Sequence, residues 1–176
     1  MTVVYNRIAL IGLGLIASSM FWSIRRGNLA QEVVGFAKSK KTRDTAKSIG
    51  LCDHVFNNLK DTVNDADLVV LCTPVGVMGE VVEQIAPYLK KGATLSDVGS
   101  VKRAVLDAVE PLMPQDVYFV PAHPLAGTEH SGPESGFSSL FENRWCILVP
   151  TTSSTPNAVE KLTRLWTGMG ALVDQM

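Results

Sequence analysis

The fold is decided near the start of the chain, by residues 8–22, which read IALIGLGLIASSMFW. An apolar run ends at Gly12, a second glycine follows at Gly14, and another apolar run begins directly after it. No charged residue lies between Arg7 and Arg25, which is also a property of signal peptides and short membrane spans. The paired glycines, the three serines and the short length argue against both. A buried strand followed by a buried helix explains the same lack of charge, and we predict that arrangement.

The composition is that of a single globular domain. The 176 residues are enough to bury one core, and 46% of them are apolar while 19% are charged. The formal net charge of −1 gives no reason to expect a nucleic-acid or membrane partner. Three cysteines, at positions 52, 72 and 146, form no C-x-x-C pair. We therefore expect neither a disulfide framework nor a metal site. The cysteine pattern instead predicts a location in the reducing cytoplasm.

Strand-like and helix-like patterns alternate along the chain. Several strand segments are apolar throughout, which is typical of a parallel sheet covered on both faces. We therefore predict an α/β fold with a doubly wound, mostly parallel sheet, and a long loop from His123 to about Ser139. Ser39 is expected to cap the second helix, with Gly50 after its end. Strands are predicted at residues 6–13, 32–37, 53–56, 67–74, 93–98, 117–122, 145–151 and 171–176, and helices at 15–27, 39–50, 76–92, 101–113 and 155–170.

The glycine turn has the spacing of a dinucleotide-binding fingerprint, because Gly12, Gly14 and Ala17 follow a predicted strand and open a predicted helix. Gly12 would form the tight turn, and Gly14 would let the backbone approach a pyrophosphate. The phosphates would then lie on the N–H groups at the start of the helix, at Leu15 and Ile16, while Ala17 would permit close packing of the helix on the strand. The motif predicts nucleotide binding, and a tight turn with only a structural role is the alternative.

The residues after the second predicted strand bear on the choice of dinucleotide. An acidic residue is expected there in a protein that binds the ribose of NAD, but this chain has Ala37, Lys38 and Ser39, followed by Lys41 and other basic residues. A cationic cluster with a hydroxyl suits a 2′-phosphate, so these four residues are candidate contacts for the nucleotide. NADP is therefore favoured over NAD as the cofactor. The alternative is an ordinary basic helix surface in contact with water.

Polar residues also follow two later strands, where a doubly wound sheet binds its ligands. Residues 97–102 read DVGSVK and residues 123–130 read HPLAGTEH. His123 is a candidate proton or hydrogen-bond acceptor, because a neutral imidazole can fill that role near pH 7, and a structural histidine is the alternative. Ser100 is either a site residue or the cap of the following helix, and Lys102 is expected to be solvated. A Ser-His-Asp hydrolase is not supported, because Ser100 lies in no G-x-S-x-G turn.

Four stretches of the chain, taken together, resemble the prephenate/arogenate (cyclohexadienyl) dehydrogenase family. They are IGLGLIASS, LCTPVGVMGEVVEQIAPYLKKGATLSDVGSVK, HPLAGTEHSG and LFENRWCILVPT, and they run in order along nearly the whole chain. The combination of DVGSVK with HPLAGTEHSG is the specific part. The resemblance implies an NAD(P)-binding domain of modified Rossmann type. It also implies the oxidative decarboxylation of prephenate to 4-hydroxyphenylpyruvate, or of arogenate to tyrosine, in tyrosine biosynthesis.

The resemblance also implies roles for individual residues. His123 matches the catalytic histidine, which accepts a hydrogen bond from the ring hydroxyl as hydride leaves that carbon for the nicotinamide. Ser100 matches a serine that orients the hydroxyl and the histidine. Glu129 matches an acidic residue at the mouth of the active site. Thr73 and Pro74 match a loop that runs beside the cofactor.

The chain departs from the family pattern in two ways. The acid after the second strand is missing, which puts NAD preference in doubt, and the family's all-helical C-terminal domain lies outside the chain. In the family that domain supplies dimer contacts and an arginine that binds a substrate carboxylate. Residues 1–176 are therefore expected to be the NAD(P)-binding domain of a longer homodimer that binds a small-molecule substrate, and to show little turnover alone. Alternatives are another Rossmann dehydrogenase or reductase, of β-hydroxyacid or imine type, and a non-catalytic nucleotide-binding module.

Overall fold

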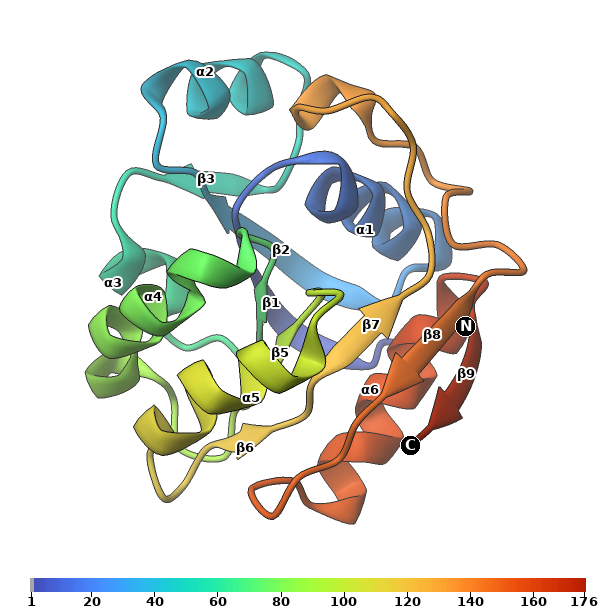
Figure 1. Ribbon diagram of the computed structural model, residues 1–176. Helices are drawn as coiled ribbons and strands as arrows, with labels where there is room; N and C mark the ends of the chain where they lie inside the picture. The colour runs from blue at the N-terminus through green and yellow to red at the C-terminus, as the bar shows by residue number, and fades with distance from the viewer. Residues whose placement is uncertain (1) are drawn as a thin grey trace.

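The computed structural model describes residues 2–176, and its centre is a six-stranded parallel sheet (Figure 1). The strand order is β3-β2-β1-β4-β5-β6, so the chain reverses direction across the sheet between β1 and β4. This is the order of the doubly wound dinucleotide-binding fold, and it confirms the predicted fold class. The strands are β1 (Tyr5–Ile11), β2 (Ala30–Phe36), β3 (His54–Phe56), β4 (Leu68–Leu71), β5 (Thr94–Asp97) and β6 (Tyr118–Phe119).

Helices cover both faces of this sheet. Successive side chains of a strand point to opposite faces, and β1 shows the consequence. Ile8 and Leu10 pack in one core with α1 and α6, whereas Ala9 and Ile11 pack in another with α3, α4 and α5. The helices are α1 (Leu15–Gly27), α2 (Lys40–Ser48), α3 (Leu59–Val63), α4 (Met78–Ile85), α5 (Lys102–Val109) and α6 (Pro156–Gly168).

The uncharged stretch between Arg7 and Arg25 forms the end of β1, the glycine turn and most of α1. Met20 and Ile24 of α1 are fully buried, so the absence of charge follows from burial against the sheet, as predicted. Within residues 2–176 no helix is long and apolar enough to cross a membrane. The cap of α2 is also confirmed, because Ser39 Oγ accepts a hydrogen bond from the Thr42 N–H at 3.3 Å.

The predicted strand at residues 117–122 is in fact two strands in two sheets. Pro121 has no N–H group to continue the pairing with β5, and its carbonyl instead accepts from the Val149 N–H at 2.9 Å. The chain therefore leaves the central sheet after β6 and enters a second sheet of order β7-β8-β9. That sheet consists of β7 (Ala122–Pro124), β8 (Trp145–Leu148) and β9 (Leu172–Gln175), and β7 runs antiparallel to β8. His123 lies in β7, so the prediction that the loop begins at His123 was wrong.

Two predicted helices are shorter than expected, and one helix was missed. The helix predicted at 76–92 is α4 flanked by two 3₁₀ turns, η1 (Val75–Val77) and η2 (Ala86–Tyr88). The helix predicted at 101–113 is α5 followed by η3 (Glu110–Leu112). Pro87 and Pro111 lie in η2 and η3, where each ring removes a donor that a continuing α-helix needs. The missed helix is α3, which Asn58 caps by accepting from the Asp61 N–H at 2.8 Å.

Candidate active site

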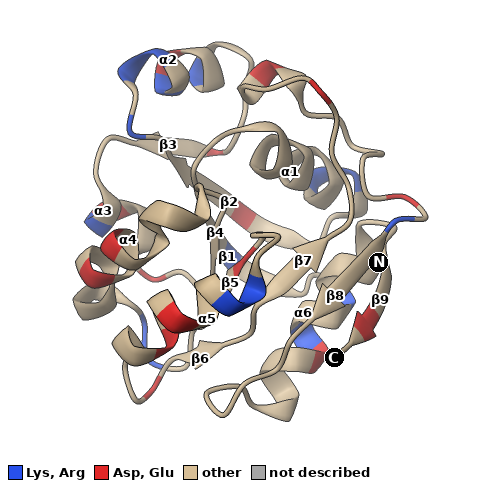
Figure 2. Ribbon diagram, viewed as in Figure 1, with Lys and Arg blue, Asp and Glu red and all other residues tan. Residues whose placement is uncertain are grey.

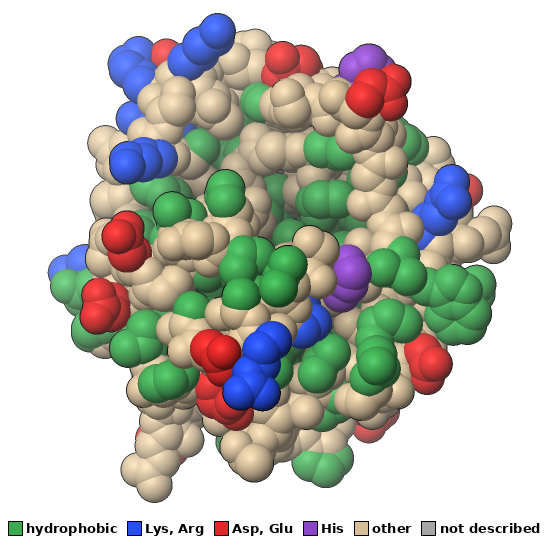
Figure 3. Space-filling view, viewed as in Figure 1, with side chains coloured by type: hydrophobic (Ala, Val, Ile, Leu, Met, Phe, Trp, Pro, Cys, Tyr) green, Lys and Arg blue, Asp and Glu red, His purple; other side chains and the backbone are tan. Residues whose placement is uncertain are grey.

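Two neighbouring pockets open at the carboxyl ends of the central strands. The first, which we call the glycine-turn pocket, has a volume of about 590 Å³. The second, the histidine pocket, has a volume of about 460 Å³. Thr73 and Pro74, which follow Cys72 beyond the end of β4, line both pockets and form their common wall. Figure 3 shows this face of the molecule hollowed in the middle, with hydrophobic side chains in the hollow and basic side chains along one border.

The glycine-turn pocket is lined by 19 residues from five parts of the fold. They are the turn after β1, the segment after β2, Leu59 at the start of α3, the segment from the end of β4 into α4, and a loop near η4 (Pro133–Ser135). The histidine pocket is lined by the segments after β4 and β5, by the end of β7 and the residues that follow it, and by Ile16 of α1. Ile16 therefore lies on the side of the glycine turn that faces the histidine.

Gly12 can be nothing but glycine in this turn. Its φ is +93°, a region that other residues rarely adopt, and its N–H donates to the Phe36 carbonyl at 2.8 Å. A β-carbon on Gly12 would lie 3.0 Å from both the carbonyl carbon and the carbonyl oxygen of Cys72. The turn is therefore pressed against the residue that follows β4, which brings it beside the wall shared by the two pockets.

Gly14 has a different reason to be glycine. It occupies the N-cap position of α1, and no atom of residues 2–176 outside its immediate neighbours lies within 4 Å of where its β-carbon would be. The space in front of the helix is therefore free. The first N–H groups of α1, on Leu15, Ile16 and Ala17, have no partner inside the helix, and the helix dipole favours negative charge there. This cradle fits the pyrophosphate of a dinucleotide.

The segment after β2 forms another wall, and it brings some but not all of the predicted residues to the pocket. Ala37, Lys38 and Ser39 line the pocket, whereas Lys41 is exposed and is not one of the lining residues among 2–176. Arg43 is engaged with the protein itself, because its Nη1 donates to the carbonyls of Ala37 and Lys38, at 2.8 Å each. That contact fixes the segment in shape. The basic residues of α2 lie at the edge of the fold in Figure 2.

Thr73 carries an unused polar atom at the common wall. Its Oγ1 is buried, and it finds no hydrogen-bond partner among residues 2–176. A buried hydroxyl without a partner is unfavourable unless something else supplies one. Thr73 lines both pockets, so a ligand that spans them would contact this residue. The free cradle at Gly14 and the wall that the two pockets share together fit a dinucleotide whose far end enters the histidine pocket.

His123 lies in β7 with its side chain half-buried at the histidine pocket. Burial lowers the pKa of His123 from its ordinary value of 6.5, and the positive charge of Lys102 lowers it further, against an opposing effect of Asp97. A lowered histidine pKa favours the neutral imidazole at pH 7. The ring is therefore in the form that accepts a proton or a hydrogen bond.

A buried ion pair supports the histidine from behind. Asp97, at the end of β5, is fully buried and forms a salt bridge with Lys102 Nζ, which also donates to the Ala122 carbonyl at 2.7 Å. Asp97 further accepts from the N–H groups of Gly99 and Ala122, at 2.8 and 3.3 Å. Burial raises the pKa of Asp97 and lowers that of Lys102, while their mutual attraction works against both shifts. The pair ties β5 and α5 to the residue directly before His123.

The expectation that Lys102 is solvated was therefore wrong, since its side chain is only 15% exposed. Lys102 is the first residue of α5, and its side chain reaches back over the end of β5 to Asp97. Asp97 was also missed as a site residue. The signal available in the sequence was a carboxylate at the end of an otherwise uncharged strand, five residues before a lysine.

Ser100 lines the histidine pocket and is exposed. The interpretation of Ser100 as the cap of α5 was wrong, because the cap position belongs to Val101, which has no side-chain oxygen. Glu129 is exposed beside His130, with 3.4 Å between its Oε1 and His130 Nε2, and it lies outside the set of residues that line the two pockets. The structure therefore brings Ser100 to His123 but leaves Glu129 beyond the pocket wall.

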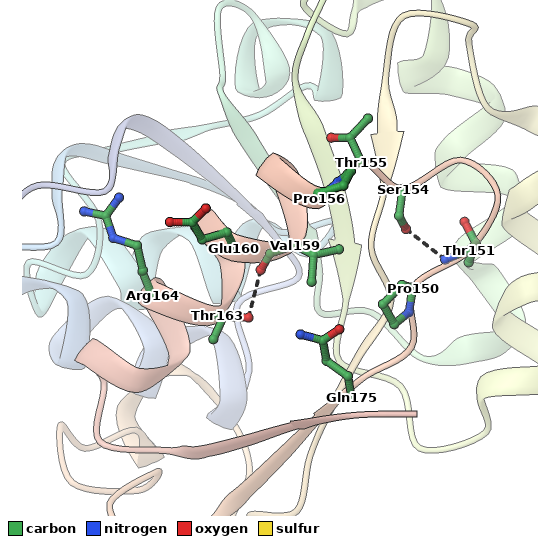
Figure 4. A pocket seen from close by; sticks show the side chains of 10 residues that line it. All are labelled: Pro150, Thr151, Ser154, Thr155, Pro156, Val159, Glu160, Thr163, Arg164 and Gln175. Carbon is green, nitrogen blue, oxygen red and sulfur yellow. Dashed lines mark hydrogen bonds between the residues drawn. The ribbon is translucent and has the colours of Figure 1, made fainter.

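A third pocket, of about 560 Å³, lies between α6, the segment before it and β9 (Figure 4). It shares no residue with the other two pockets. Its hydroxyl groups bond within the protein: Thr163 Oγ1 donates to the Val159 carbonyl at 2.8 Å, and Ser154 Oγ accepts from the Thr151 N–H at 2.9 Å.

Among residues 2–176 no group of three or more His, Cys, Asp or Glu side chains could hold a metal ion.

The strand order, the glycine cradle at the first switch of direction and the adjoining histidine pocket define a nucleotide-binding domain of the doubly wound class. Residues 22–175 match the family model described as the prephenate dehydrogenase nucleotide-binding domain. The chain belongs to this family.

Curated relatives agree with the family match. The chain is 39% identical over 173 residues to a cyclohexadienyl dehydrogenase of Zymomonas mobilis, a match that covers 98% of this chain and 59% of the relative. It is 31% identical to a prephenate dehydrogenase of Bacillus subtilis, over 94% of this chain and 45% of that protein. The chain thus spans about half to three-fifths of the length of these relatives.

A solved structure agrees in fold. The prephenate dehydrogenase of Aquifex aeolicus, in complex with hydroxyphenyl propionate and NAD+, superimposes with a TM-score of 0.89 at 28% identity. The match covers 97% of this chain and 59% of the Aquifex chain.

Proposed function

We propose that residues 1–176 form the NAD(P)-binding domain of a prephenate or arogenate dehydrogenase and carry its catalytic histidine. The observation that supports this most directly is the common wall of Thr73 and Pro74. A dinucleotide with its pyrophosphate on the cradle at Gly14 has its nicotinamide end beside that wall. A ring substrate in the histidine pocket then lies next to both the nicotinamide and His123.

The proposed reaction is the oxidative decarboxylation of a cyclohexadienyl ring that bears a hydroxyl group. The bound NAD(P)+ supplies an acceptor for the hydride that leaves the carbon bearing this hydroxyl. His123 accepts the hydroxyl's hydrogen bond and then its proton as the carbonyl forms, a role for which the neutral imidazole is suited. The bond between the ring and the carboxylate then breaks, and carbon dioxide leaves while the electron pair of that bond stays with the ring and completes its aromatic system. The carbonyl oxygen becomes the phenol oxygen and takes back the proton that His123 had accepted. Loss of carbon dioxide makes the overall step effectively irreversible.

The remaining residues act through position and charge. Ser100 orients the substrate hydroxyl toward His123, since both residues line the same pocket. Asp97 and Lys102 hold the backbone of Ala122 and so fix the strand that carries His123. Glu129 is proposed to act at the mouth of the pocket. Carbon dioxide release and hydride transfer need no metal ion, and none is proposed.

NADP+ is the preferred cofactor in this proposal. Lys38 and Ser39 line the pocket where the ribose of the adenosine half would lie, and no acidic residue follows β2 to bind a plain 2′-hydroxyl. A lysine and a hydroxyl favour the extra phosphate of NADP+. The other cofactor-binding residues of the proposal are Gly12, Gly14, Leu15, Ile16, Ala17, Ala37, Lys41, Thr73 and Pro74.

The proposal is tested by measuring binding and turnover separately. Calorimetric titration of the chain with NADP+ and with NAD+ is expected to show binding of both, with NADP+ tighter. The full-length protein is expected to reduce NADP+ in the presence of prephenate or arogenate. Dinucleotide binding with both substrates inert would favour another reductase of the same fold. Absence of dinucleotide binding would remove the proposed function.

A further inference from the structure

One wall of the glycine-turn pocket comes from a segment far away in the sequence. Residues 132–138, which we call the strap, lie between β7 and β8, and Figure 1 shows this part of the chain passing over α1 toward α2. The strap includes η4, which contacts both α1 and α2. Gly132 and the buried Pro133 line the glycine-turn pocket. The same stretch of chain that begins with His123 thus ends against the nucleotide site.

Two buried serines of α1 attach the strap. Ser19 Oγ accepts a hydrogen bond from the Phe137 N–H at 3.1 Å, and Ser23 Oγ donates to the Ser138 carbonyl at 2.8 Å. Both serines are completely buried on a helix whose other buried residues are mostly apolar. Buried hydroxyl groups are costly unless they are hydrogen-bonded, so these two bonds explain why α1 carries serines there.

Gly136 lets the strap approach α1 closely. A β-carbon at this position would lie 2.6 Å from Ser18 Cβ and 2.7 Å from the backbone nitrogen of Ser19. Its φ of −73° is open to any residue, so the glycine is not required by backbone conformation. Close approach of two backbones is the remaining reason for glycine here. Any side chain at residue 136 would push the strap off the helix.

The strap faces the half of the site that would hold adenosine. The ribose of that half is expected beside the segment that follows β2, where Lys38 and Ser39 line the pocket. This segment leads into α2, and η4 contacts α2. Pro133 is apolar and has a fixed φ, so it offers a rigid wall at that point. We propose that Ser19 and Gly136 are positioning residues, which hold Pro133 as the wall of the adenosine half and so determine cofactor affinity.

This inference rests on the proposed function, because it needs a dinucleotide in the pocket. The test compares Ser19→Ala and Gly136→Ala with the wild-type chain in calorimetric titrations. The ligands are NADP+ and adenosine 2′,5′-bisphosphate, which carries only the adenosine half. Both variants are expected to bind both ligands about tenfold more weakly, by the same factor for each ligand. Ser139→Ala, on the exposed end of the same stretch, is the matched control and is expected to bind as the wild type does.

A second measurement separates the two proposals. Hydrogen exchange at the Phe137 amide is expected to be slow in the wild type and faster in Ser19→Ala, which loses the acceptor. Faster exchange with unchanged affinity for the bisphosphate would overturn the inference and leave the proposed function standing. Loss of affinity for NADP+ alone would also overturn it, because the strap would then act on the other half. If the wild-type chain binds neither ligand while the Phe137 amide exchanges slowly, both proposals are overturned. The strap would then only stabilise α1.

Discussion

The phosphate cradle of the glycine-turn pocket is formed by main-chain atoms, whereas the histidine pocket depends on ionisable side chains buried around the end of β5. In the first, Gly12 provides a turn, Gly14 leaves a space, and the N–H groups of α1 face that space. In the second, Asp97 and Lys102 support the strand that carries His123. Main-chain sites tolerate most side-chain changes but not the addition of a side chain. Buried charges tolerate neither loss nor replacement of a partner.

The largest effect on turnover is expected from His123→Asn in the full-length protein. Removal of the acceptor is expected to lower kcat by about 10²–10⁴-fold while dinucleotide affinity changes little. His130→Asn, an exposed histidine seven residues later, is the control and is expected to keep its activity. Steady-state kinetics with prephenate and arogenate measure both. Near-normal turnover by His123→Asn would remove His123 from the mechanism. The proposed contrast between a main-chain cradle and a pocket that works through ionisable side chains would then fail.

The next largest effect is on stability, from Lys102→Met. The change leaves the carboxylate of Asp97 buried without its partner, so the free energy of unfolding is expected to fall by about 3–5 kcal/mol at pH 7. Arg103→Met, on the exposed neighbouring residue, is expected to change it by less than about 0.5 kcal/mol. Denaturant unfolding measures both. Equal and small effects of the two variants would mean that the ion pair is not buried as described.

The stability deficit of Lys102→Met should also depend on pH. Burial already raises the pKa of Asp97, and loss of the lysine's charge raises it further. A carboxyl group whose folded pKa lies above its unfolded pKa binds a proton more readily in the folded state. The deficit is therefore expected to be largest at neutral pH and to shrink as pH falls through the folded pKa of Asp97 toward its ordinary value of 3.8.

A smaller, selective effect is expected from Lys38→Ala. Loss of a lysine at the ribose end is expected to weaken NADP+ binding by about tenfold, or about 1.4 kcal/mol, and to leave NAD+ binding unchanged. Lys40→Ala is the matched control, because Lys40 pairs with Asp44 at 2.7 Å and is not a lining residue among 2–176. Calorimetric titrations measure all four affinities. Equal losses for the two dinucleotides would show that Lys38 does not read the 2′-phosphate.

Sequence reasoning identifies the two regions unequally, for a physical reason. The turn from β1 into α1 is local: the strand, the glycines and the helix lie within residues 5–27, and their pattern predicts the fold and the cradle. The neighbourhood of His123 is not local. It depends on Pro121 sending the chain into a second sheet, which brings Ala122 to Asp97 and Lys102, about twenty-five and twenty residues away in sequence.

The missed features share this dependence on distant contacts. Lys102 looks like an ordinary exposed lysine until β5 and β7 are next to each other, and Asp97 becomes a site residue only with it. Pro133 becomes part of the nucleotide pocket only when the strap lies on α1. The sequence predicts that the basic residues after β2 act as one cluster. Among the lysines there, only Lys38 lines the pocket, because α2 begins at Lys40 and the other lysines lie along that helix.

The most direct test of the account is a titration of Gly14→Val with NADP+. A β-carbon at residue 14 would meet no atom of residues 2–176 within 4 Å outside its immediate neighbours, and the φ of −99° suits any residue, so the variant is expected to fold as the wild type does. Its branched side chain would fill the cradle, and NADP+ affinity is expected to fall by at least about a hundredfold, or about 2.8 kcal/mol. Wild-type affinity in a folded Gly14→Val protein would contradict the claim that the pyrophosphate lies on the start of α1.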